Sequence, residues 1–277
     1  MKFRTAALQA LLCPDPDEKC AQVRALFDAV SQCPEGLQDW ASEQAMPAPT
    51  LAGRPALPRL VDPGQVAHRS PFTAKGRAAL VHAICHIEFN AINLALDAVA
   101  RFDAMPAAYY QDWLRVAHEE AYHFGLLRDA LAQVPPEPAQ TRPWQYGDFD
   151  AHDGLWLMCE KTASDIVARM ALVPRTLEAR GLDATPLIQA KLQRVGTPDA
   201  LHTCSVLDIV LRDEVGHVAI GNHWYRVLCA QKGLDPVAHY RLLVSTYQAP
   251  KLKPPFNESA RRKAGFTDLE ISFLIDA

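Results

Sequence analysis

Residues 79–100 form the stretch that most restricts what this chain can fold into. The run is nearly long enough to cross a bilayer and has an apolar background, but it carries six polar side chains: His82, His86, Glu88, Asn90, Asn93 and Asp97. That many polar groups exclude a lipid-exposed span. The mixture instead indicates a helix inside a protein core, whose polar side chains are buried for a reason.

The composition supports a folded protein with a sizeable core. Of 277 residues, 49% are hydrophobic and 22% charged, and the formal net charge is -4. This balance gives no support for a nucleic-acid partner or a membrane surface. Seven cysteines without a Cys-x-x-Cys pair predict neither a disulfide framework nor a thiolate zinc site. We therefore expect a cytoplasmic protein.

The pattern of the chain predicts an all-α protein. Long Ala/Leu-rich segments, and no runs of alternating β-branched residues, indicate helices separated by proline-rich loops. A connection of about 20 residues separates the second long segment from the third, which is the loop pattern of a four-helix bundle with one long crossover. The four segments are Thr73–Phe102, Pro106–Gln133, Gly154–Arg180 and Pro198–Lys232.

Three regions follow from this reading. Residues 1–72 are predicted to be short helices, with 17–31 the clearest, followed by a proline-rich loop at 46–63 that wraps the core. Residues 73–232 would be the bundle, and residues 233–277 a helical tail packed on it, with a capping box from Thr267 to Glu270 and solvated basic residues at 251–263. The third segment is predicted to be interrupted at 181–186 and to continue as one arm to Val195.

Two copies of Glu-x-x-His suggest the chemistry. Glu120 and His123 lie in the second long segment, and Glu214 and His217 in the fourth. Positions three apart share one face of a helix, so each motif directs a carboxylate and an imidazole to the same point. Both motifs fall on the apolar stripe of their helix, which predicts that they face the core.

The other two long segments each carry a glutamate on the equivalent stripe. Halfway between Glu88 and Glu120 is residue 104, and halfway between Glu178 and Glu214 is residue 196; both lie in predicted turns. Residues equidistant from a turn are level with each other in an antiparallel pair, so these glutamates would converge. The choice of Glu178 assumes that the third segment is one arm. Otherwise Glu160 or Asp165 becomes the candidate.

Six residues, Glu88, Glu120, His123, Glu178, Glu214 and His217, therefore form a candidate site for two divalent metal ions. Four carboxylates carry a charge of -4, which two such ions would cancel, and mixed oxygen and imidazole ligands suit iron or manganese, with zinc as an alternative. Glu119 and Asp213 could accept hydrogen bonds from the outer nitrogens of the two histidines. His82 and His86 are predicted to be hydrogen-bonding residues of the core.

At these residues the sequence resembles a known family. The stretches Ala83-Ile-Cys-His-Ile-Glu88, Leu211-Arg-Asp-Glu-Val-Gly-His217 and Pro255-Phe-Asn-x-x-Ala-Arg-x-x-Ala-Gly-Phe266 resemble the bacterial domain-of-unknown-function 455 family, within the ferritin-like superfamily, over about residues 50 to 270. The resemblance implies a ferritin-like bundle and a two-metal site. By the superfamily pattern Glu120 and Glu214 would bridge the metals. Glu88 with His123 and Glu178 with His217 would complete one metal each.

The sequence thus predicts a non-haem di-iron or manganese–iron oxidoreductase that acts with O2 or peroxide on a small-molecule substrate. An iron-storage ferroxidase, a tRNA-modifying hydroxylase and a metal-free helical interaction protein are the alternatives. The sequence leaves open whether the protein forms a homodimer.

Overall fold

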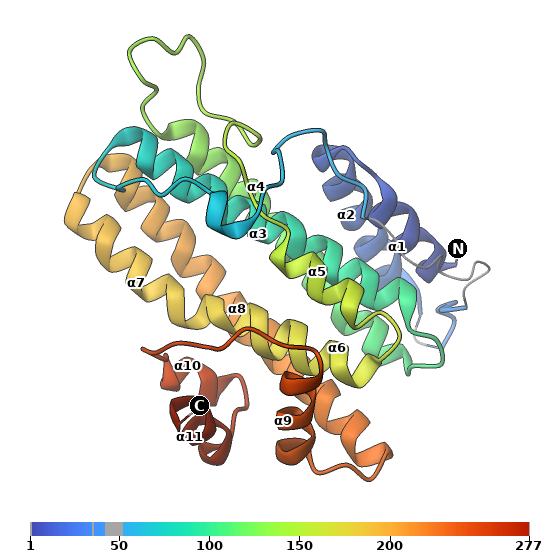
Figure 1. Ribbon diagram of the computed structural model, residues 1–277. Coiled ribbons are helices and arrows are strands. Elements are labelled where there is room, and N and C mark those ends of the chain that lie inside the picture. The colour runs from blue at the N-terminus through green and yellow to red at the C-terminus, as the bar shows by residue number, and fades with distance from the viewer. Residues whose placement is uncertain (1, 35, 42–51, 277) are drawn as a thin grey trace. The chain divides into compact units, whose positions relative to one another are not determined.

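The computed structural model describes residues 2–34, 36–41 and 52–276, and its regular elements there are all helical (Figure 1). The all-α prediction is confirmed. Within this described part, the sole β-bridge pairs Leu60 with Ala151. The helices are α1 (Phe3–Leu12), α2 (Pro16–Gln32), η1 (Pro63–Gln65), α3 (Ala74–Arg101), α4 (Ala107–Gln133), α5 (Gly154–Lys161), α6 (Ile166–Leu172), η2 (Val173–Glu178), α7 (Ala179–Val195), α8 (Pro198–Gln231), α9 (Pro236–Thr246), α10 (Glu258–Lys263) and α11 (Asp268–Asp276).

Three of the four long segments form as predicted, as α3, α4 and α8, but the break in the third segment lies elsewhere. α5 ends at Lys161, and α6 begins after Asp165, whose carboxylate accepts hydrogen bonds from the first backbone N–H groups of α6. This is a strong N-cap. The predicted interruption at 181–186 is wrong, because α7 runs through it with Pro186 inside the helix.

A side chain from the tail explains why Pro186 does not break α7. Proline has no N–H to donate to the carbonyl four residues earlier, which here belongs to Leu182. The side-chain amide of Asn257 donates to that carbonyl instead, at 3.1 Å. The prediction that the chain continues as one helical arm from Glu178 to Val195 is therefore correct. The donor that makes this possible, Asn257, is too far along the chain for local sequence patterns to reveal it.

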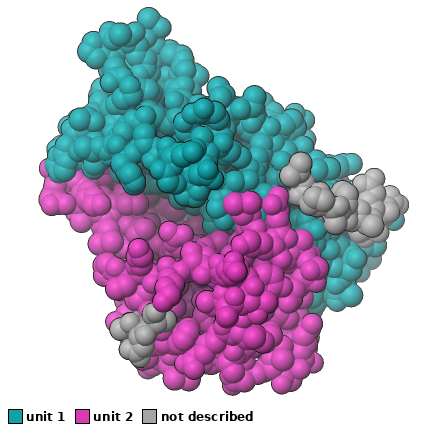
Figure 2. Space-filling view, in the orientation of Figure 1, with its two compact units in different colours: residues 1–156, 195–206 teal, residues 157–194, 207–277 magenta. Residues whose placement is uncertain are grey.

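The chain divides into two compact units, coloured separately in Figure 2. Unit 1 comprises residues 1–156 and 195–206, and unit 2 comprises residues 157–194 and 207–277. The two units are groups of residues that contact one another, and they do not coincide with the predicted regions 1–72, 73–232 and 233–277. The boundaries of those regions stay a prediction. The part of the proline-rich loop at 46–51 lies outside the described residues.

Unit 1 is built on the pair of helices α3 and α4, with α1 packed on α3 and α2 on α4. Lys19 of α2 is fully buried, and its ammonium donates to the carbonyls of Ala10 and Leu11 and to Oδ1 of Asn93, at 2.7–3.0 Å. Burial lowers the pKa of Lys19 to about 7, but three acceptors around three N–H groups favour the protonated form. Lys19 thus connects α1 and α2 by hydrogen bonds to the middle of α3.

The polar side chains within α3 hold the chain segments that cover it. His82 Nε2 accepts from the backbone N–H of Gly147 at 3.0 Å. His86 lies 2.8 Å from the hydroxyl of Tyr146 through Nδ1 and 3.3 Å from the carbonyl of His152 through Nε2. Both histidines are therefore hydrogen-bonding residues of the core, as predicted. They attach the crossover that leads from α4 to α5.

This burial also explains the membrane-like composition of α3. By length and composition α3 could cross a membrane, with a mean hydropathy of 1.4 over its most apolar window. However, 78% of that window is buried inside the structure. Core helices of this length have the same composition, so the apolar residues are accounted for by packing.

In unit 2 the tail completes a small apolar core. Phe266 and Ile271 pack with side chains from α7 and α8, including Leu182 and Val218. The capping box opens α11 as predicted: the N–H of Thr267 donates to Glu270, and the N–H of Glu270 donates to Oγ1 of Thr267. One expectation for the tail is wrong.

Arg261 is the exception among the basic tail residues, because it is fully buried and not solvated. Its guanidinium donates to the carboxylate of Asp183 on α7 at 2.5 Å and lies over the rings of Phe256 and Phe266. The pairing partner is 78 residues earlier in the chain, so local sequence gave no sign of it.

The buried histidines predict a loss of stability in acid. Burial, opposed by the charge of Asp148, lowers the pKa of His82 from 6.5 to about 4. Between these values the unfolded chain binds a proton that the folded chain does not, so the free energy of unfolding falls as the pH falls. His82→Gln keeps an acceptor for Gly147 but cannot titrate. At pH 5, relative to pH 7.5, this variant should lose up to about 2 kcal/mol less stability than the wild type.

Denaturant titrations at the two pH values measure the difference. His202→Gln, at an exposed histidine of α8, is the control and should lose as much stability as the wild type. An equal loss in His82→Gln would contradict the assignment of the acid sensitivity to His82.

Candidate metal centre

Three of the six predicted ligands come together within unit 1. Glu88 lies on α3, and Glu120 and His123 lie one turn apart on α4. The hydroxyl of Tyr110 fixes the turn between the two helices, because it donates to the carbonyl of Phe102 and accepts from a backbone N–H in the turn. The turn sets the register of α3 and α4 and so places Glu88 level with the motif on α4.

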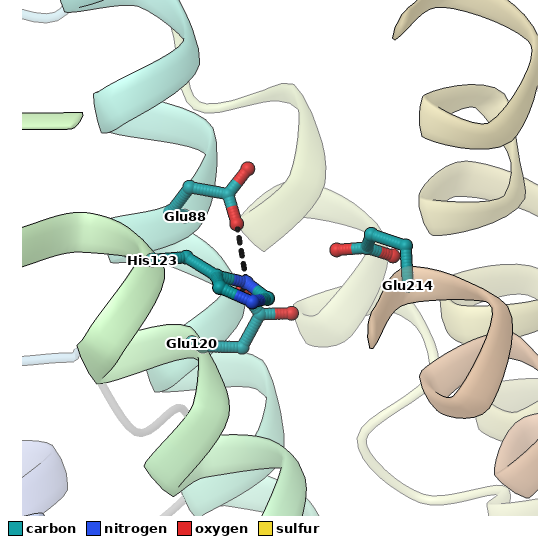
Figure 3. Close-up of side chains that lie close together, drawn as sticks. All are labelled: Glu88, Glu120, His123 and Glu214. Atoms are coloured by element: carbon teal, nitrogen blue, oxygen red, sulfur yellow. Dashed lines mark hydrogen bonds and ion pairs between the residues drawn. The ribbon is translucent and has the colours of Figure 1, made fainter. Parts of the chain in front are cut away.

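The three side chains meet at Nδ1 of His123 (Figure 3). This nitrogen lies 3.3 Å from Oε2 of Glu120 and 3.4 Å from Oε2 of Glu88. All three residues are buried, with exposed fractions of 3% for Glu88 and 0% for Glu120 and His123. One ligand atom from each lies within 4.8 Å of the others.

The electrostatics of this cluster require a cation. Burial lowers the pKa of His123, but hydrogen bonds to Glu120 and Glu88 and their negative charges outweigh that effect and raise the pKa to about 11. A protonated imidazole thus balances part of the charge of two carboxylates held away from water. A metal ion bound between the same atoms would take over this role and displace the proton.

The donor set therefore fits a metal. Two carboxylate oxygens and one imidazole nitrogen are the mixed ligands used for iron, manganese and zinc, and each lies within reach of a shared point. A buried cluster of acidic and histidine side chains here could hold a metal ion. His82 and His86 are not part of it, since their ring nitrogens serve the crossover.

The other three predicted ligands lie in unit 2. Glu214 and His217 share one face of α8, with Nδ1 of His217 3.7 Å from Oε1 of Glu214, and both are buried. Glu178, also buried, is the last residue of η2, a single π-helical turn between α6 and α7. Asp165, one of the alternatives for the third segment, is engaged as the cap of α6. Glu160, the other alternative, is half-buried on α5.

A close approach between η2 and α8 sets the level of Glu178. A Cβ atom on Gly221 would lie 2.6 Å from Cβ of Pro174, so at this point the glycine lets the two elements touch. Pro174 is four residues before Glu178, and Gly221 is four residues after His217. The contact therefore favours a register in which Glu178 and His217 are level on facing elements of unit 2.

Sequence reasoning missed the π-helical turn, although Pro174 was a signal for it. A proline inside a helix cannot make the usual backbone hydrogen bond, and a π turn is one way to absorb that loss. Such turns are frequent at functional sites. Asp213 accepts hydrogen bonds from Arg212. The roles of Asp213 and Glu119 as acceptors for the two histidines stay predictions.

The fold and the site define an all-helical protein with a buried carboxylate–histidine cluster. Comparison with known proteins places it more closely. The chain belongs to the family described as "Protein of unknown function (DUF455)", whose model matches residues 12–272. It is 44% identical over 274 residues to an uncharacterized protein of Haemophilus influenzae, covering 96% of this chain and 91% of that protein. No solved structure matches the chain with significance.

The close contact at Gly221 predicts that alanine substitutions at two glycines of α8 change the free energy of unfolding in opposite directions. Gly221→Ala should lower the free energy of unfolding by about 1–3 kcal/mol, because the added methyl group overpacks the contact with Pro174. Gly216→Ala is the matched control, since it is exposed and its Cβ would meet open space. This variant should gain about 0.5–1 kcal/mol from helix propensity. Equal effects in denaturant unfolding would exclude the contact.

Proposed function

We propose that this protein is a ferritin-like metalloprotein that holds two divalent metal ions and acts as a non-haem oxidoreductase. The buried cluster of Glu88, Glu120 and His123 carries the proposal. Iron is the favoured metal, with manganese or zinc as alternatives, because the ligands combine hard oxygen atoms with imidazole. The family carries no established activity, so the reaction is inferred from the site alone.

In the proposed centre each unit supplies three ligands. Glu88 with His123 would hold one ion, and Glu178 with His217 would hold the other. By the pattern of the ferritin-like superfamily, both ions would share Glu120 and Glu214. The continuity of helix α8 supports the assignment of Glu214 to the proposed centre. The first turn of α8 belongs to unit 1, where Asp199 pairs with buried Arg77, and the same helix continues to Glu214.

Charge balance supports two ions over one. Four glutamates contribute -4, and a single divalent ion would leave two negative charges in a buried site. Uncompensated buried charge costs several kcal/mol per ion, and two divalent ions remove it. Both histidines would then bind as neutral imidazoles, and His123 would lose its proton on metal binding.

When bound, two iron ions would supply the electrons that reduce O2 or peroxide while a small molecule is oxidised. The chain's own residues hold the ligand geometry and exclude bulk water, since the three unit 1 ligands are at most 3% exposed. We also propose that the protein acts in the cytoplasm and has no nucleic-acid or membrane partner.

Metal content tests the proposal directly. Protein purified without chelators, or reconstituted anaerobically with Fe(II), should contain close to two metal ions per chain. An air pulse should then produce the near-ultraviolet absorption of oxygen-bridged ferric iron, and metal should raise the thermal midpoint of unfolding. Fewer than about one ion per chain, with no spectral change and no stabilisation, would refute the proposal.

A pair of variants tests which residue of the third segment is a ligand. Glu178→Ala should bind one ion fewer than the wild type, because it removes a carboxylate from one ion of the proposed pair. Glu160→Ala removes a half-buried glutamate from α5 and should still bind two. Metal analysis after gel filtration measures both. The reverse result would transfer the ligand role to Glu160.

A further inference from the structure

Arg175 is a buried cation that the proposed metal centre does not use directly. It belongs to the π-helical turn η2 and is 2% exposed. Its guanidinium donates to Oδ1 of Asn222 at 2.9 Å and to Oε1 of Glu270 at 2.6 Å. Three aromatic rings also surround it, with centroids 4.9–5.1 Å from the guanidinium carbon: Tyr225, Tyr240 and Phe266.

The carboxylate that pairs with Arg175 comes from the tail. Glu270 is 6% exposed and is held in place by several contacts at once. Its second oxygen accepts from the N–H and hydroxyl of Thr267 and from the guanidinium of Arg226. Glu270 is therefore held by contacts other than the one with Arg175, which lies 95 residues earlier in the chain.

Arg175 lies within the same turn as Glu178. A π turn has poorer backbone geometry than an α-helix and persists where surrounding contacts hold it. Several contacts hold this one, among them Gly221 of α8 against Pro174 and Glu270 bound to Arg175. The Arg175–Glu270 contact is a buried ion pair. Buried ion pairs often add little net stability over apolar side chains of similar volume, so we assign this one a role in fixing geometry.

We propose that Glu270 is a positioning residue for the metal centre: it holds Arg175, Arg175 fixes the π-helical turn, and the turn directs the carboxylate of Glu178. The inference rests on the proposed function and adds the tail to the machinery that supports the site. Groups that orient metal ligands from outside typically contribute 10- to 100-fold to metal affinity. In this proposal Glu270 affects the position of the Glu178 carboxylate through Arg175 and is not itself a metal ligand.

Co(II) titration of the full-length apoprotein, followed by absorption and equilibrium dialysis, tests this. The wild type should bind two ions. Glu270→Ala should bind one of them about 10- to 100-fold more weakly, with a changed absorption spectrum for that ion, and the other with unchanged affinity. Glu270→Gln keeps an oxygen acceptor for Arg175 and should bind both ions with close to wild-type affinity. Its metal affinity can still be measured if the alanine variant fails to fold.

Asp183→Ala and Asp183→Asn are the matched controls. They break another buried arginine–carboxylate pair of the tail, Arg261 with Asp183, and leave the pair of Arg175 with Glu270 unchanged. They should lower the thermal midpoint but bind two ions with wild-type affinity. Wild-type binding by Glu270→Ala, or equal weakening by the Asp183 variants, would overturn the inference and leave the proposed function intact. A wild type that binds no metal would overturn both.

Discussion

The shared imidazole of His123 is the interaction on which the rest of unit 1 depends. A positive charge between two buried carboxylates lowers the cost of keeping both ionised, and Nδ1 of His123 is 3.3–3.4 Å from both. The cluster therefore lies where the buried faces of α3 and α4 meet. The opposite side of α3 can then use its remaining polar side chains to bind the crossover and, through Asn93, the N-terminal helices.

The parts of the site that follow from helix geometry could be predicted from sequence. Glu120 and His123 are one turn apart on an apolar stripe, and Glu88 is level with them because it is equally far from the turn. The all-helical character followed from the same periodicity. These features depend on neighbours within a few residues or across one short connection, so a single sequence contains them.

The features that sequence reasoning missed depend on distant partners. Gly181 and Pro186 are helix breakers by local rules, yet α7 continues because Asn257 supplies the missing donor. Arg261 has the sequence context of a solvated cation but pairs with Asp183 in the interior. The π turn at Val173–Glu178 is likewise held by Gly221 and Glu270, which lie far along the chain. In each case tertiary contacts override a local preference.

The separation of these partners has a consequence for how the protein is made. The donor that completes α7 is 75 residues downstream of the carbonyl it binds, and the carboxylate that neutralises Arg175 is 95 residues downstream. A ribosome adds about 5–20 residues per second, so η2 and α7 must wait for several seconds after synthesis without their native partners. During that interval Arg175 lacks the carboxylate that neutralises it in the folded protein. The native contacts of η2 and α7 can therefore form only after the tail has been synthesised.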